Sequence, residues 1–79
     1  MMKYGVYTIY DNVARESGPL FVAKNEEVAL RNYKHLLARE GVTNNDYSLY
    51  YLGTYNMESM EFYMVAKREI GKEDEQSIS

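Results

Sequence analysis

The sequence has no cysteine and no tryptophan, and it contains one histidine, His35, and one proline. The absence of cysteine excludes disulfides, thiolate metal sites and cysteine nucleophiles together. A zinc or iron centre would have to rest almost wholly on carboxylates, which is an unusual ligand set for either metal. We therefore expect no metal site and no other cofactor.

Long apolar runs are also missing. No stretch approaches the roughly 20 apolar residues that cross a bilayer. The first ten residues, MMKYGVYTIY, follow a strand pattern and lack the apolar core of a signal peptide. These absences predict an intracellular protein that does not enter a membrane, and the lack of cysteine agrees with a reducing compartment.

An excess of basic residues is absent as well, because the formal net charge is −3. Residues 71–79 contribute −2 of this, and residues 1–70 hold eight basic and nine acidic side chains. Proteins that bind duplex DNA strongly carry a basic stripe. Tight binding to the phosphate backbone is thus disfavoured, whereas a local basic patch would still allow weak or single-strand-selective binding.

The short chain limits how stable the fold can be. Seventy-nine residues make one domain, and a domain of this size hides only about 60% of the surface that its unfolded chain exposes. Small domains compensate with disulfides, metals or oligomerisation. Since the first two are excluded, we expect a homo-oligomer, most simply a homodimer.

Local patterns predict one helix and several strands. The helix is the clearest element: Asn25 stands at its N-cap, apolar residues recur at spacings of three and four, and Gly41 fits the C-cap. β-branched and aromatic runs predict the strands. The expected elements are a strand at 3–10, a loop at 11–19, a strand at 20–23, a helix at 26–40, a connection at 42–45, a strand at 46–55, a turn at 56–59, a strand at 60–70 and a disordered tail at 71–79.

This order, β-β-α-β-β, predicts an α+β fold with one domain at residues 1–70. A single helix can cover only one face of a small antiparallel sheet, yet apolar residues occur on both faces of the long strands. In the last strand we expect alternation, with residues 60, 62, 64 and 66 on one face and residues 61, 63, 65 and 67 on the other. The residues expected in the core are Leu30, Tyr33 and Leu37, with Val6 or Ile9, Leu49 or Leu52, and Phe62 or Met64.

No group of residues indicates catalysis. His35 falls in the middle of the helix, where an exposed position explains it better than a catalytic triad. The paired carboxylates lie at the helix start and in the tail, as solvated charges commonly do. The glycines are scattered, so there is no phosphate-binding loop. We expect the protein not to be an enzyme.

Two features are candidates for binding nucleic acid. Arg31, Lys34 (or His35) and Arg39 share one side of the helix and could follow a phosphate backbone, or they form an ordinary solvated face. The chain also has nine tyrosines, and aromatic rings on a sheet can stack unpaired bases or fill a core and a dimer interface.

Tyr50 is the tyrosine that we expect to stack on a base. Leu49 and Tyr51 lie together on the side of their strand that faces the helix, so Tyr50 points to the other side. Lys67 and Arg68, at the end of the last strand, would supply charge. The candidate nucleic-acid-binding residues are therefore Arg31, Lys34, Arg39, Tyr50, Lys67 and Arg68.

Several short segments, taken together, carry a family resemblance. They are Tyr10-Asp11, then Pro19 and Phe21, then Asn25, Ala29, Arg31 and Tyr33, and finally Asp46-Tyr47-x-Leu49-Tyr50-x-Leu52-Gly53. Over about residues 4–56, their order and spacing resemble the small nonstructural protein of gokushoviruses, which are single-stranded DNA phages of the microvirus family.

The resemblance implies a protein that is absent from the virion, acts in the host bacterial cytoplasm and is associated with phage DNA replication or genome packaging. It also implies single-stranded DNA as a partner. The alternative is a protein–protein adaptor that docks the phage replication initiator, a host protein or a capsid precursor without touching DNA. The acidic balance favours the adaptor, and the resemblance favours DNA.

Overall fold

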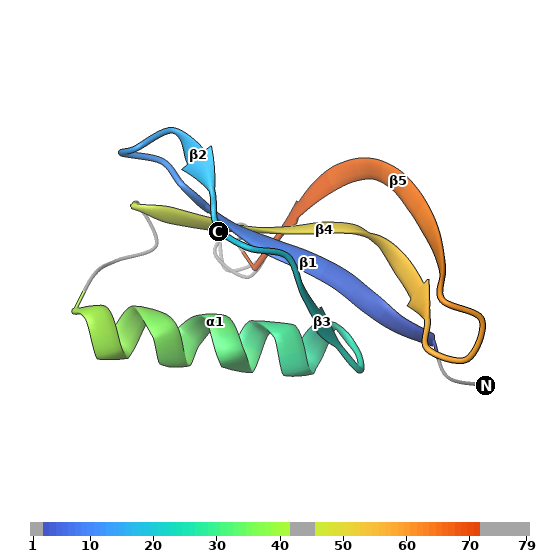
Figure 1. The fold of residues 1–79 in the computed structure, drawn as a ribbon. Helices are drawn as coiled ribbons and strands as arrows, with labels where there is room; N and C mark the ends of the chain where they lie inside the picture. The colour runs from blue at the N-terminus through green and yellow to red at the C-terminus, as the bar shows by residue number, and fades with distance from the viewer. Residues whose placement is uncertain (1–2, 42–45, 72–79) are drawn as a thin grey trace, which may run out of the picture.

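A computed structural model describes residues 3–41 and 46–71, which form one antiparallel sheet with one helix packed on it (Figure 1). The expected α+β class is confirmed. Residues 72–79, for which we expected disorder, lie outside the described residues. The elements are β1 (Lys3–Asp11), β2 (Glu16–Ser17), β3 (Phe21–Ala23), α1 (Glu26–Glu40), β4 (Tyr47–Asn56) and β5 (Glu61–Ile70).

The first strand, β1, organises the sheet. Along one edge it pairs with β2 and β3, and along the other with β4, which in turn pairs with β5. The sequence predicted a loop at 11–19, so the short strand β2 was not expected. The Asp11 carboxylate accepts hydrogen bonds from the backbone N–H groups of Val13 and Ala14, at 2.9 and 3.0 Å, and this tight turn returns Glu16 to pair with Asp11.

The helix begins and ends where the sequence predicts. The Asn25 side chain accepts a hydrogen bond from the Val28 N–H at 2.9 Å, which satisfies one of the free donors of the first turn. At the other end Gly41 adopts a left-handed conformation with φ 69°. Glycine does so without steric cost, and its N–H bonds the carbonyl of Ala38.

The core lies between α1 and the sheet. Its buried residues are Tyr7, Ala23, Ala29, Tyr33, Leu49 and Ile70. The Tyr33 hydroxyl donates a hydrogen bond to the Tyr47 carbonyl oxygen at 2.8 Å. Burial, with a smaller contribution from Glu69, raises the pKa of Tyr33 to about 12.

The predicted core is partly right for the helix and wrong for the last strand. Tyr33, Leu49 and Val6 are buried, although Val6 lies on the sheet face away from the core cluster. Leu30 and Leu37 are partly buried against the cluster. Phe62 and Met64 were expected inside, but they are 56% and 54% exposed, and Ile70 represents β5 in the core.

A bulge in β5 explains part of this error. Tyr51 pairs with Arg68 and Gly53 pairs with Met64, so the one residue between them on β4 lies opposite three on β5. Bulged residues break the alternation of a strand. The expected faces of β5 hold from Glu61 to Met64, and the pattern is wrong at Lys67, which lies on the same side of the sheet as Tyr50.

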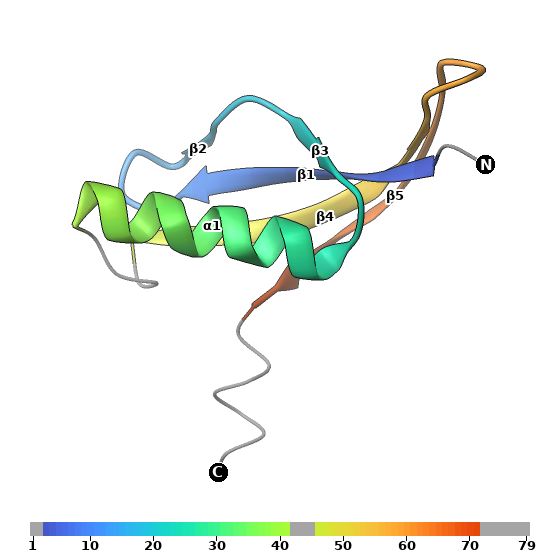
Figure 2. The same cartoon turned by 90° about the horizontal axis from the view of Figure 1, so that it is seen from below.

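The helix covers only part of the sheet. Its 15 residues extend about 22 Å, whereas the ten residues of β4 extend about 33 Å. The β4–β5 hairpin therefore projects beyond α1 (Figures 1 and 2). We call residues 53–64 the hairpin end, and we call the sheet face away from α1 the outer face.

Candidate nucleic-acid interface

The outer face is defined by the register of the strands. Tyr7 and Leu49 point toward α1 and lie in the core, so their neighbours Thr8 and Tyr50, which pair with each other, point away from it. The helix α1 lies on the opposite side of the sheet (Figure 1). The expected orientation of Tyr50 therefore agrees with the structure.

A hollow of about 560 Å³ lies on this face. It is formed by the second half of β1, the middle of β4, the bulge of β5 and the segment that leads from β2 to β3. We call it the outer-face hollow. Its lining residues are Thr8, Tyr10, Ser17, Leu20, Tyr50, Leu52 and Lys67.

Two tyrosines form an aromatic pair in the outer-face hollow. The rings of Tyr10 and Tyr50 are 6.3 Å apart between centroids and meet at 89°, so one ring meets the other edge-on. In such a pair, each ring keeps at least one face that the other does not use. Both residues are partly exposed, and a flat apolar group can therefore reach them.

Hydrogen bonds fix the wall of this hollow. The Thr8 hydroxyl donates to the carbonyl oxygen of Gly18 at 3.1 Å. The Gly18 N–H donates in turn to the carbonyl oxygen of Ile9 at 2.9 Å. These bonds hold the segment around Ser17 against β1. The wall is thus part of the folded structure and needs no ligand to form.

The structure brings Tyr50 and Lys67 together and places the other candidates elsewhere. Both line the outer-face hollow. Arg31 and Lys34 are exposed on α1, on the opposite side of the sheet, beside a shallow hollow of about 400 Å³ that Glu27 and His35 also line. Arg39 is exposed in the last turn of α1. The helix residues and Tyr50 therefore belong to two separate surfaces.

Arg68 also lies on the helix side. Its guanidinium is 3.7 Å from a Glu26 carboxylate oxygen and 5.1 Å from the centroid of the Tyr51 ring. Both contacts involve residues at the helix side of the sheet, so Arg68 and Lys67 diverge although they are adjacent in sequence. Its positive charge already has an anionic partner.

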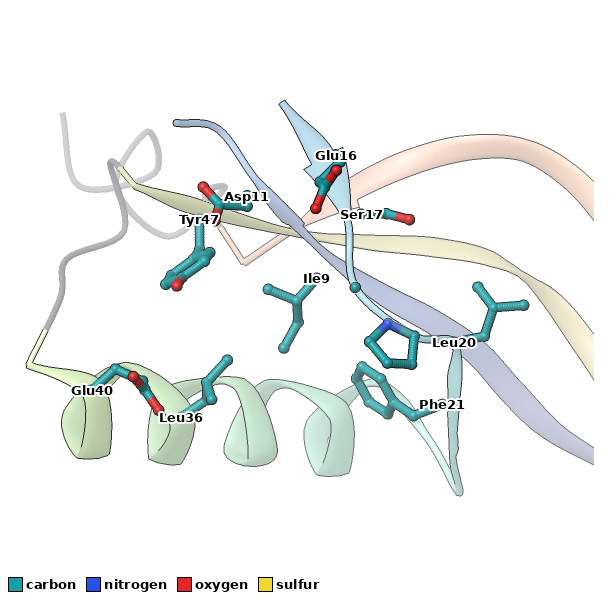
Figure 3. Close-up of a pocket in the computed structure, with 11 residues that line it drawn as sticks. Ile9, Asp11, Glu16, Ser17, Leu20, Phe21, Leu36, Glu40 and Tyr47 are labelled. Carbon is teal, nitrogen blue, oxygen red and sulfur yellow. The ribbon is translucent and has the colours of Figure 1, made fainter. Parts of the chain in front are cut away.

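A second deep hollow is less suited to nucleic acid. It measures about 550 Å³ and lies between the sheet and the second half of α1, where Ile9 and Tyr47 point toward the helix and Leu36 points back (Figure 3). Acidic side chains line it and basic ones do not: they are Asp11, Glu16 and Glu40. Phosphate would be repelled by these carboxylates, because like charges in close proximity are unfavourable.

The described residues contain neither a cluster of metal ligands nor a membrane-spanning helix. Over residues 3–41 and 46–71, no cluster of three or more His, Asp or Glu side chains is arranged to hold a metal ion. Within the same residues, no helix is long and apolar enough to cross a membrane.

Sequence reasoning missed several members of the outer-face hollow. Thr8, Tyr10 and Leu52 were not candidates. Thr8 and Tyr10 join Tyr50 because β1 pairs with β4, and Leu52 is two residues from Tyr50 on β4 itself. The alternation of β1 does place Thr8 and Tyr10 on one face. The sequence does not reveal the strand register that brings Thr8 and Tyr10 beside Tyr50.

The comparisons with known proteins give one match. A family model described as "Phage ORF5 protein" matches residues 4–75, which is nearly the whole chain. Neither the curated proteins nor the solved structures gave a match.

Proposed function

Since this chain belongs to the Phage ORF5 protein family, we propose that it is a non-catalytic phage protein that binds single-stranded DNA through its outer-face hollow. Its role would be in genome replication or packaging in the host bacterial cytoplasm, outside the virion. The resemblance to the gokushovirus nonstructural protein supports this more specific assignment.

The observation that carries the proposal is the meeting of Tyr10, Tyr50 and Lys67 in one hollow on the outer face. Proteins that bind single strands combine aromatic rings, on which bases stack, with cations that contact the backbone. The Tyr10–Tyr50 pair offers the ring faces. Lys67 offers a cation beside them.

The same features favour single strands over duplexes. A base can stack on a tyrosine only when it is not stacked inside a helix. Duplex binding relies on many phosphate contacts, and the basic side chains of this protein are divided between two sides of the sheet. We therefore expect weak binding that prefers unpaired DNA.

The test is a fluorescence-polarisation titration with a labelled single-stranded oligonucleotide and its duplex. The Tyr50→Ala variant should lose about 1–3 kcal/mol of binding free energy, because one stacking surface is removed. Tyr63→Ala is the matched control: Tyr63 is 52% exposed and lies on the helix-facing side of β5. If the single strand fails to bind at low salt, or if both variants lose equal affinity, the proposal is wrong.

A second candidate function is the protein–protein adaptor. The net charge of −3 and the exposed apolar side chains of the hairpin end favour it. The adaptor would dock the phage replication initiator, a host protein or a capsid precursor. Calorimetry with the purified replication initiator separates the two functions: the adaptor predicts binding there and none to DNA.

A further inference from the structure

Exposed apolar side chains gather at one end of the molecule. Within residues 3–41 and 46–71, every exposed large hydrophobic residue except Val13 lies just before or in β3, in β5 or in the turn that precedes β5. The hairpin end projects beyond α1, whereas β3 leads directly into the start of α1 (Figure 1). Scattered apolar residues are normal on a protein surface, whereas a contiguous group marks an interaction site.

The strand register divides this group between the two faces. Val22, Val6, Gly53 and Met64 are consecutive cross-strand partners and form one row. Tyr4, Tyr55 and Phe62 form the next. Since Val6 lies on the outer face, both rows do. The exposed members, with the adjacent Leu20, form what we call the hairpin patch: Leu20, Val22, Phe62 and Met64.

The other face of the hairpin end differs. There the Tyr63 hydroxyl donates a hydrogen bond to Glu61 at 3.0 Å, and the Lys3 ammonium lies 5.9 Å from the centroid of the Tyr63 ring. Polar and charged groups thus surround the aromatic ring on this side. The hairpin patch contains no charged residue. Its exposure to water is therefore unfavourable, and it offers no cation to bind a phosphate backbone.

We propose that the hairpin patch is where a second copy of this chain binds, in a two-fold homodimer. An interface of this symmetry must be complementary to itself. The patch meets this requirement, because the projecting Phe62 and Met64 lie beside a hollow of about 310 Å³. Its lining residues are hydrophobic or aromatic, and none is charged: Val6, Leu20, Phe21, Val22, Tyr55 and Phe62. The projections of one copy can fill the hollow of the other.

The area of the patch agrees with what a dimer needs. Its four side chains are 41–56% exposed and offer on the order of 400 Å² of apolar surface. A standard interface buries about 800 Å² on each partner, and a little more than half of that is apolar. A second copy would also stabilise a 79-residue domain that has no disulfide.

The experiment compares the mass of the protein in solution with that of two matched variants. Met64→Glu adds a charge to the patch, and Val13→Glu adds the same charge at a residue that is 74% exposed at the other end of β1. Sedimentation equilibrium should give twice the chain mass for the wild type and for Val13→Glu. Met64→Glu should raise the dimer dissociation constant at least about tenfold, because the new charge would be buried without a partner.

A second measurement does not depend on an added charge. The chain has no cysteine, so Met64→Cys and Val13→Cys each carry one thiol. Alkylation of Met64→Cys should slow at high protein concentration and recover on dilution, whereas alkylation of Val13→Cys should not change. Circular dichroism checks that each variant is folded.

Three results would overturn the proposal. The first is a wild-type protein that stays monomeric at high concentration. The second is an equal dimer dissociation constant for Met64→Glu and Val13→Glu. The third is a dimer in which the thiol of Met64→Cys is alkylated as fast as in the monomer.

The outer-face hollow shares Leu20 with the hairpin patch. The DNA proposal rests on Tyr10, Tyr50 and Lys67, which lie outside the patch, so none of these results decides it. A loss of DNA affinity in Tyr50→Ala with an unchanged mass would likewise leave the dimer intact.

Discussion

Strands β4 and β5 pass through two different environments. At the end covered by α1, Leu49 and Ile70 are 0% and 1% exposed. At the hairpin end, Phe62 and Met64 are more than half exposed, although they are as apolar as the buried pair. The face of the sheet accounts for the difference: Leu49 and Ile70 face α1, whereas the bulge in β5 places Phe62 and Met64 on the outer face, which α1 does not cover. Burial here depends on which face of the sheet a side chain occupies.

The comparison shows how one sheet can serve folding and binding separately. The covered end holds the core cluster, which must stabilise the fold. The uncovered end keeps apolar residues that contribute little to the core of a single chain. Exposed apolar strand residues of this kind can bind a partner, and they also make a protein prone to aggregation.

Truncation of a residue at each end should give the largest contrast. Leu49→Ala should lower the free energy of unfolding by about 2–5 kcal/mol, because it leaves a cavity in the core. Met64→Ala should change it by about 0.5 kcal/mol or less, as surface substitutions do. Urea unfolding at a protein concentration low enough to keep single chains measures both. Similar losses in the two variants would contradict the division of the sheet into two regions.

High pH should act on the covered end. The pKa of Tyr33 is raised from 10.0 to about 12, so its neutral form is favoured in the folded state. The stability linked to it is complete below pH 10 and is lost as the pH rises toward 12, by about 2–3 kcal/mol in all. Urea unfolding at pH 9 and above pH 11 measures the loss.

The control is Tyr33→Phe, which removes the phenol and its hydrogen bond to Tyr47. This variant should be less stable than the wild type at neutral pH and should lose less stability between the two pH values. Tyr7 contributes in the same direction, since burial raises the pKa of its phenol as well. An unchanged pH dependence in Tyr33→Phe would assign the whole effect to other groups.

The smallest expected effect compares the two sides of the sheet. Lys67→Gln and Lys34→Gln remove the same charge, one from the outer-face hollow and one from α1. Removing one cation that neutralises a phosphate reduces the salt dependence of single-strand binding by about 0.7 log units per log unit of salt. Lys67→Gln should show this reduction and Lys34→Gln should not. The reverse result would move the binding surface to the helix.

Much of the fold follows from local signals in the sequence. The helix is predictable because Asn25 and Gly41 act on their own neighbours through hydrogen bonds and backbone conformation. The orientation of Tyr50 follows from alternation within one strand. Burial of Phe62 and Met64 was wrongly predicted, because alternation within β5 does not reveal the bulge that puts these residues on the face away from α1.

The candidate site was less predictable for the same reason. Lys67 and Arg68 looked like one pair of charges, yet the bulge directs Lys67 to the outer face while Arg68 meets Glu26 and Tyr51 on the helix side. The helix cations were grouped with Tyr50 by charge alone. Their separation depends on the packing of α1 against one face of the sheet.

By itself, the sequence determined the type and order of the main elements, the helix ends and the presence of apolar residues on both strand faces. These depend on interactions among residues a few positions apart. Only the tertiary structure decided that Tyr10 meets Tyr50, that Lys67 joins them and that Phe62 and Met64 stay exposed. Those outcomes depend on strand register, on a bulge and on which face of the sheet the helix covers, and all three arise from contacts between distant parts of the chain.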